Sequence, residues 1–312
     1  MGYIQDKVEK QQKRIRFNGF FYAIISSASF GFSPLFSIAL IAAGLSHFDI
    51  LTYRWGVAAL VLMIYAAIKG KTLKLLSFGE IWRVLLLSAL RAITSITLLI
   101  GYANIASGIA STINFMYPVV VALCMMLFFG EKKSLSNILS ILMSIAGVYL
   151  LAHGDGLFVE GGNPTLGLTC SIISAVSFAA YYIIMKRTKA DKIEVVKFTT
   201  WIMMMSAVYF FICGLIFDGR ITLVTDGRAW VYILGLGLWS TMVSNFTGVK
   251  AIRRIGPTLT SILGALQPLT AVILGVIFLD EHLGVKTVIG MIMILVSVTM
   301  VVLQKHDHQK QR

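Results

Sequence analysis

The chain has few charged residues and few cysteines for its length. Only 13% of its 312 residues are Asp, Glu, Lys or Arg, it has three cysteines, and its mean hydropathy is +0.84. A soluble globule of this size could not bury so much apolar surface, so lipid must serve as the solvent. Three scattered cysteines make neither a disulfide framework nor a metal cluster, and we expect small core residues there. The sequence predicts an integral membrane protein without a metal or cofactor.

Carboxylates are missing from the middle of the apolar segments. All 14 Asp and Glu residues lie in loops, tails or segment ends. A proton-driven carrier commonly needs a titratable acid near the bilayer midplane, so proton coupling through an acid is disfavoured. Facilitated diffusion, exchange or coupling through the solute's own charge fits better. Glu131 and Glu281 are the fallback proton sites, with capping of the next helix as the favoured role.

Catalytic and channel motifs are also missing. The segments contain no His-Glu-x-x-His helix, no aspartate pair and no serine–histidine arrangement, because the five histidines lie in loops or the tail. We therefore expect no enzyme. A channel remains the rival class, although the sequence has neither a re-entrant segment nor a repeated filter motif.

Long apolar runs are abundant. A membrane helix needs about 20 predominantly apolar residues, whereas an outer-membrane barrel would show alternating segments of about 10. The sequence predicts an all-α protein with ten transmembrane helices at 18–43, 48–68, 81–104, 107–129, 135–152, 165–185, 195–217, 229–250, 257–279 and 284–304.

The Lys and Arg residues predict how the chain lies in the membrane. Nearly all of the 27 fall in the N-terminal stretch, the C-terminal tail and alternate loops. The other face receives only Arg220, Arg228 and Lys286. By the positive-inside rule both termini are cytoplasmic, and the excess of cations reflects topology rather than nucleic-acid binding.

The chain contains the same pattern twice. At a shift of 150, Ser111–Val148 aligns with Ser261–Val298 without a gap, and Pro118 falls on Pro268. Five crossings per copy would invert the second copy relative to the first, as in alternating-access transporters. We expect a basic tail at 1–17, a first repeat at 18–155, an external linker at 156–164, a second repeat at 165–304 and a cytoplasmic tail at 305–312.

Small polar residues form helical stripes in both copies. Tyr22, Ser26, Ser29 and Ser33 are spaced to lie on one face of the first segment. The matching segment of the second copy repeats the stripe with Cys170, Ser174, Ser177 and Tyr181. These residues line a cavity in one interpretation; in the other they let helices pack closely and hydrogen-bond across the contact.

Proline interrupts three segments, at Pro34, Pro118 and Pro268. Each removes a backbone hydrogen bond and should bend its helix, and bent helices are where carriers of this kind move or bind. Proline is also common in membrane helices generally, but the matched pair in two copies weakens that alternative. Polar residues accompany the paired prolines: Asn114, Tyr117 and Gln267.

Two arginines lie inside apolar segments. Arg91 is near the predicted midplane, where an unpaired cation is costly. It could anchor a solute carboxylate or phosphate, or it could pair with carbonyls at the bends near Pro34 or Pro118. Arg54 is nearer its segment end, and we expect it to extend to the outer interface in a structural role.

These residues resemble the drug/metabolite transporter superfamily, and within it the EamA-type ten-helix carriers. The resemblance rests on Pro118 through Glu131, Gly147–Val-Tyr-Leu, the matching Pro268 through Glu281 with Gly290, and Arg54. It implies a central cavity and transport of amino acids or other metabolites across a bacterial inner membrane.

We therefore predict an inner-membrane exporter or exchanger of a small polar metabolite that works by alternating access, with a passive facilitator or channel as the alternative. Its partners are the small-molecule substrate and the lipid bilayer, no nucleic acid is involved, and a monomer would suffice. The candidate binding residues are Ser26, Ser29, Ser33, Arg91, Thr94, Asn114, Tyr117, Tyr181, Ser244, Asn245 and Gln267, and the candidate hinges are Pro34, Pro118 and Pro268.

Overall fold

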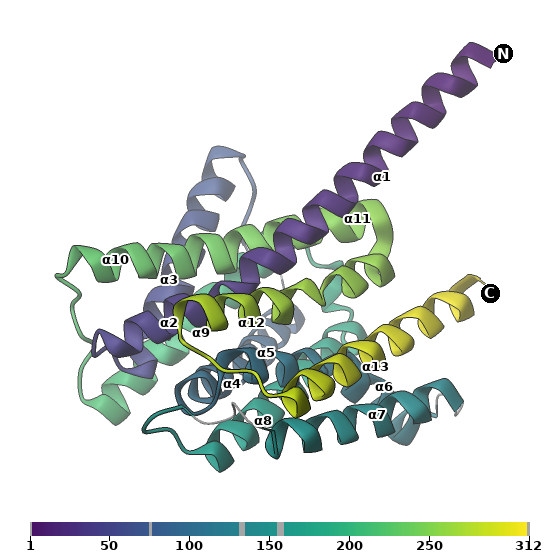
Figure 1. Cartoon of the computed structure of the whole chain (residues 1–312). Coiled ribbons are helices and arrows are strands. Elements are labelled where there is room, and N and C mark those ends of the chain that lie inside the picture. Colours follow the sequence, from purple (N-terminus) through teal and green to yellow (C-terminus); the bar gives the residue numbers. More distant parts are fainter. Residues whose placement is uncertain (1, 75–76, 131–134, 155–158, 311–312) are drawn as a thin grey trace.

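The computed structural model describes the backbone of residues 2–74, 77–130, 135–154 and 159–310. Side chains are described from 17 to 303 within these ranges, except at 191, 253, 256–259 and 261. This part of the chain is a bundle of helices without a strand, and Figure 1 shows both chain ends at the same end of the bundle. The predicted all-α fold is confirmed.

The helices follow one another through short connections. They are α1 (Gly2–Gly31), α2 (Ser33–Ala42), α3 (His47–Ile68), α4 (Phe78–Asn104), α5 (Ser107–Phe115), α6 (Tyr117–Phe128), α7 (Leu135–Ala152), α8 (Pro164–Arg187), the 3₁₀ turn η1 (Ala190–Lys192), α9 (Val195–Cys213), the π-helical η2 (Gly214–Asp218), α10 (Gly227–Leu234), the π-helical η3 (Gly235–Val243), α11 (Ser244–Leu263), α12 (Leu266–Phe278) and α13 (Val285–Lys310).

Eight helices of the described chain are long and apolar enough to cross a membrane. These spans coincide with eight of the ten predicted segments. They are Phe17–Ala42, His47–Ile68, Phe78–Asn104, Ser107–Phe128, Leu135–Ala152, Pro164–Arg187, Val195–Asp218 and Val285–Leu303.

The remaining two predicted segments, 229–250 and 257–279, have different boundaries in the structure. The chain is helical without interruption from Gly227 to Leu263, and the apolar α12 follows after two residues. Residues 251–256 are thus helical where the sequence predicted a loop. A helix satisfies its own backbone hydrogen bonds, so it can continue past the apolar run into a basic stretch.

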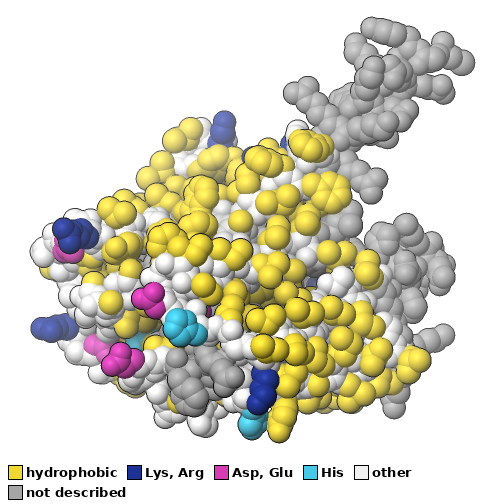
Figure 2. Space-filling view, viewed as in Figure 1, with side chains coloured by type: hydrophobic (Ala, Val, Ile, Leu, Met, Phe, Trp, Pro, Cys, Tyr) yellow, Lys and Arg dark blue, Asp and Glu magenta, His cyan; other side chains and the backbone are white. Residues whose placement is uncertain are grey.

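The side chains of α7 are distributed as membrane solvation requires. Its buried positions include Ser140, Ser144 and Gly147, whereas Leu142 and Ile145 are exposed. Small polar residues permit close helix contacts, and large apolar residues face lipid. Hydrophobic side chains likewise dominate the face seen in Figure 2, where the coloured charged side chains lie mostly toward its margins. The chain is a multi-pass membrane protein.

Each major helix contact has a counterpart between the corresponding helices when the two halves of the chain are exchanged. α4 packs extensively on α8, and the corresponding helices of the opposite halves, α11 and α1, pack on each other equally well. The pairs α7–α13 and α3–α9 each join equivalent helices of the two halves. This pairing is the one expected when two copies of one motif meet around a pseudo-two-fold axis.

Each predicted proline bend coincides with a break between helices. Pro34 and Pro118 occupy the first turns of α2 and α6, after breaks at Phe32 and Met116. Pro268 is the third residue of α12, after the break at residues 264–265. Proline lacks an N–H and is tolerated in a first turn, so the helices restart there instead of continuing.

Glycines allow α7 and α13 to approach closely. A Cβ atom at Gly290 would lie 2.8 Å from the carbonyl oxygen of Gly147, and one at Gly147 would lie 2.9 Å from the carbonyl oxygen of Gly290. The hydroxyl groups of Ser144 and Ser297 form a hydrogen bond across the same contact, with their oxygens 2.6 Å apart. Because backbone is the obstacle on both sides, a larger residue would force the helices apart.

We expect Gly290→Ala to destabilise the protein by about 1–3 kcal/mol through overpacking. The matched control is Gly56→Ala on α3, where no atom lies within 4 Å of the added Cβ. This control should be neutral or stabilising by up to about 1 kcal/mol, because alanine favours a helix. Thermal unfolding of the detergent-solubilised variants measures both effects, and equal melting temperatures would contradict the proposed close contact.

Candidate functional site

A cavity of about 250 Å³ lies inside the bundle and draws residues from both halves of the chain. Its walls come from α1, α3, α4, α5, α6, α8, α11 and α12. Eight of the predicted binding residues line it: Ser26, Arg91, Thr94, Asn114, Tyr117, Ser244, Asn245 and Gln267.

Arg91 enters the cavity from the middle of α4. Its guanidinium carbon lies 4.5 Å from the ring centroid of Phe178, 5.6 Å from that of Trp55 and 5.9 Å from that of Tyr181. Within the described chain it has no ion pair and no hydrogen bond to carbonyls near Pro34 or Pro118. Aromatic faces stabilise a desolvated cation by up to about 2 kcal/mol, but they do not neutralise its charge.

Arg54 does not extend to the interface, and that expectation is wrong. Its side chain is 6% exposed, and its Nε donates a hydrogen bond of 2.9 Å to Thr241 Oγ1. Its guanidinium carbon lies 5.6 Å from the ring centroids of both Phe30 and Trp55. Helix packing determines this direction: α3 contacts both α9 and η3, so Arg54 faces protein and lines the same cavity as Arg91.

Hydroxyl and amide groups fix the polar walls. Asn114 Nδ2 donates to Ser174 Oγ at 2.9 Å, linking α5 to α8. Ser26 Oγ donates to the Ser244 carbonyl at 2.7 Å, and Ser177 Oγ donates to the Leu90 carbonyl at 2.9 Å. The serine stripes therefore hydrogen-bond across helix contacts, while Ser26 also lines the cavity.

Three predicted binding residues do not line the cavity. Ser29 is buried and donates to the Ile25 carbonyl of its own helix. Ser33 is fully buried at the break between α1 and α2, and its hydroxyl has no partner among the described residues. Tyr181 packs behind the cavity, with its ring centroid 6.0 Å from that of Phe178.

Aromatic rings build one wall. Tyr117 at the start of α6 stacks on Tyr182 of α8, with ring centroids 5.2 Å apart and planes 9° apart. Phe178 lies against both rings, 4.6 Å from Tyr117 and 5.0 Å from Tyr182. The break before Pro118 places Tyr117 here, beside the face of Phe178 on which Arg91 rests.

Sequence reasoning missed several lining residues. Ser27, Phe30, Ser95, Phe178 and Tyr182 all contribute to the cavity. Ser95 lies next to the predicted Thr94, so the polar run of α4 contained a signal for it. The aromatic residues gave no such signal, because aromatic side chains on an apolar helix usually indicate core packing.

Glu281 caps a helix of the opposite half. Its Oε1 accepts a hydrogen bond of 2.6 Å from the Ser107 N–H, and its Oε2 accepts one of 3.3 Å from the Gly108 N–H. A carboxylate is favourable at a helix N-terminus, where free N–H groups and the helix dipole meet. The expected capping of the next helix is thus corrected to capping of α5. Glu131 lies outside the described residues.

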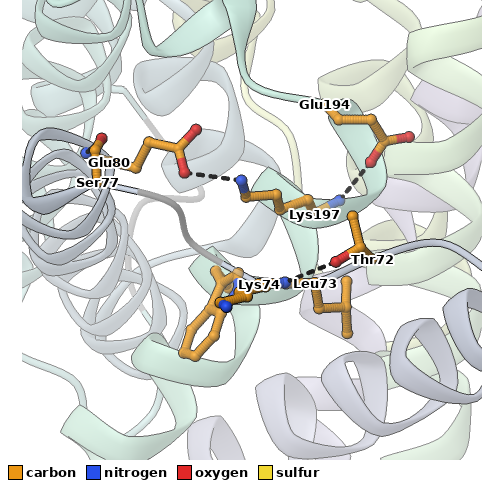
Figure 3. Close-up of polar contacts among 8 residues, drawn as sticks. Thr72, Leu73, Lys74, Ser77, Glu80, Glu194 and Lys197 are labelled. Carbon is orange, nitrogen blue, oxygen red and sulfur yellow. Dashed lines mark hydrogen bonds and ion pairs between the residues drawn. The ribbon is translucent and has the colours of Figure 1, made fainter.

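A buried ion pair joins the halves elsewhere. Lys197 Nζ of α9 lies 2.8 Å from Glu80 Oε2 of α4, and their side chains are 7% and 20% exposed (Figure 3). The Lys197 N–H donates to Glu194 Oε2 at 2.8 Å, which caps α9. Trp201 donates its indole N–H to the Leu73 carbonyl at 2.6 Å nearby.

These features define a class of protein. The spans are long and apolar, and polar side chains from both halves converge on one internal cavity. No group of three or more His, Cys, Asp or Glu side chains in the described chain could hold a metal ion. A polytopic membrane bundle with a polar cavity is the architecture of a solute transporter.

The chain belongs to the EamA-like transporter family. The family model matches it twice, at residues 17–152 and 165–303. This assignment places it among membrane transporters of small solutes rather than enzymes.

Similar proteins from plants and bacteria match over most of the chain. A WAT1-related protein of Arabidopsis thaliana is 25% identical over 311 residues, covering 88% of this chain and 81% of the relative. The uncharacterized transporter YvbV of Bacillus subtilis is 25% identical over 289 residues, covering 89% and 85%. Protein PecM of Dickeya dadantii is 23% identical, covering 72% and 74%.

A solved crystal structure shares the fold. It superposes with a TM-score of 0.63 at 15% identity, over 94% of this chain and 97% of the other. At this identity the likeness concerns the fold alone.

Proposed function

We infer that the chain is a carrier of the bacterial inner membrane that moves a small polar metabolite by alternating access. The observation that carries this inference is the cavity, where polar side chains and two arginines meet inside an apolar bundle. Polar groups in hydrocarbon are costly, and those that persist usually mark a solute pathway. An exporter or exchanger of an amino acid or related compound fits a cavity whose described lining residues include no acid for proton coupling.

The topology that goes with this function has ten crossings, in two inverted five-helix repeats at 18–155 and 165–304. The exchange-related helix contacts and the distribution of Lys and Arg support it. Both termini are then cytoplasmic, and one chain suffices for the pathway. The breaks at Pro34, Pro118 and Pro268 act as hinges around which the helices beside the cavity reorient.

The alternative is a passive facilitator or channel through the same cavity. A channel needs a path open to both sides at once, whereas a carrier exposes its site to one side at a time. Accessibility from each side therefore excludes a closed or one-sided pocket, and counterflow separates a carrier from a channel.

The test is cysteine accessibility at position 267. Gln267→Cys in a background lacking Cys124, Cys170 and Cys213 is exposed to a membrane-impermeant maleimide in right-side-out and inverted vesicles. Alternating access predicts labelling from both sides. Arg228→Cys, at an exposed position outside the cavity, is the control and should react from one side only. Labelling of position 267 from a single side would overturn the inference, and no ligand is needed.

A further inference from the structure

We propose that the cavity selects a small organic anion without an ammonium group, whose carboxylate or phosphate is held by Arg54 and Arg91. This proposal rests on the inferred transport function and names the substrate class of the same cavity. It departs from the expectation of an amino acid and keeps only related compounds that carry an acid group and no ammonium group.

The first argument is the charge of the site. Arg54 and Arg91 both line the cavity, and both guanidinium carbons lie 5.6 Å from the ring of Trp55, so the two cations share one indole. Neither has an ion pair with any described residue. Intramembrane cations normally require a counter-charge, and here the solute is the group that can supply it.

The second argument is the absence of a place for a cation. Among the described residues that line the cavity there is no Asp or Glu, only hydroxyls, amides, apolar groups and the two arginines. Aromatic faces can also hold an ammonium group. The rings of Phe178 and Trp55 already carry guanidinium groups. An α-ammonium would therefore lose its hydration, gain no negative partner and meet two like charges.

The third argument concerns size and shape. Ligand pockets typically measure about 300–1,000 Å³, so a cavity of about 250 Å³ suits a metabolite rather than a drug-sized compound. The stacked rings of Tyr117 and Tyr182 offer a rigid apolar surface close to Arg91. The best occupant is an acid whose charged group lies at the arginines and whose planar or apolar body packs against these rings.

Arginine is suited to this role at both positions. Its guanidinium presents a planar set of donors that matches a carboxylate or phosphate, which lysine does not. Arg54 is oriented by its Nε hydrogen bond to Thr241, which leaves the terminal nitrogens for a ligand. Asn114 and Ser174, linked at 2.9 Å, hold the α5–α8 side of the cavity in place without adding charge.

The experiment compares solutes that share a phenyl ring and differ in the charge of the attached group. Purified protein is titrated with phenylacetate, phenyl phosphate, phenylacetamide, phenethylamine and phenylalanine, and thermal stabilisation gives the affinity of each. We expect at least one of the two acids to bind at millimolar concentration or below, and at least tenfold more tightly than the amide, the amine or the amino acid.

Substitutions of the two arginines test whether they cause the preference for acids. Arg91→Gln and Arg54→Gln should each weaken binding of the acid about tenfold to a hundredfold, as for loss of a charge-assisted hydrogen bond. Arg54→Lys retains the charge and should bind more tightly than Arg54→Gln. Arg220→Gln removes an exposed arginine outside the cavity and should leave affinity unchanged.

The proposal is overturned if neither acid stabilises the protein at 10 mM, if the amine or amino acid binds as tightly as the acids, or if the preference survives in the Arg54→Gln/Arg91→Gln double variant. Each result would leave the transport function to be judged by the labelling at position 267. Loss of two-sided labelling, with acid binding intact, would instead overturn the carrier and keep the anion site.

Discussion

Replacing Arg91 by glutamine is expected to reduce solute uptake about 100-fold at low solute concentration, measured as Vmax/KM in proteoliposomes. Arg91 has no ion pair among the described residues and faces a cavity lined by hydroxyls and amides. Loss of a charge-assisted contact in such a site costs about 1.5–3 kcal/mol, and loss of the long-range attraction adds to it. Arg91→Lys should recover part of the rate, because lysine keeps the charge but not the planar donors.

The same substitution should not destabilise the protein. An unpaired guanidinium inside the bundle is costly, and its aromatic contacts offset only about 2 kcal/mol of that cost. We therefore expect Arg91→Gln to melt at the wild-type temperature or above, as when a functional residue is removed from a strained site. A large fall in melting temperature together with wild-type uptake would show instead that Arg91 is structural.

Glu80→Ala is expected to lower stability by about 3–5 kcal/mol. Its partner Lys197 is 7% exposed, so removing Glu80 leaves an ammonium group buried without the carboxylate at 2.8 Å. A second substitution, Lys197→Met, removes the ammonium group that Glu80→Ala leaves unpaired and should recover most of the lost stability. Thermal and denaturant unfolding in detergent measure the stability of each variant relative to wild type, and both methods should rank the variants in the same order.

The chain offers a matched control for that prediction. Lys71 and Glu194 form an ion pair of 3.4 Å, but their side chains are 48% and 44% exposed. Water screens such a pair, so Lys71→Ala should cost less than about 1 kcal/mol. If Glu80→Ala and Lys71→Ala have equal effects, the buried pair does not stabilise the junction between α4 and α9.

Much of the fold follows from local signals in the sequence. Apolar length predicted the spans, and the lack of an N–H in proline predicted the helix breaks near Pro34, Pro118 and Pro268. The continuation of α11 through residues 251–256 did not follow, because hydropathy reports where lipid ends and not where a helix ends. Charged residues outside the membrane can remain helical.

Much of the cavity followed from polar residues at shared depth, and the rest depended on packing that no periodicity encodes. The direction of Arg54 is determined by the contacts of α3 with α9 and η3, helices far away in the chain. The capping of α5 by Glu281 joins residues 174 apart in sequence. Ser29 and Ser33 lie on the predicted stripe yet are buried in helix contacts. The Ser29 hydroxyl donates to a backbone carbonyl of its own helix, which serine does as readily as it binds a solute.

Counterflow is the measurement that tests the carrier account most directly. Proteoliposomes are loaded with an excess of the acid that stabilises the protein best, and the same acid in labelled form is added outside. A carrier that exposes one site alternately predicts transient accumulation of label above its equilibrium level, and Arg91→Gln should abolish it. Simple equilibration of the label, without saturation or overshoot, would identify a channel and contradict alternating access through this cavity.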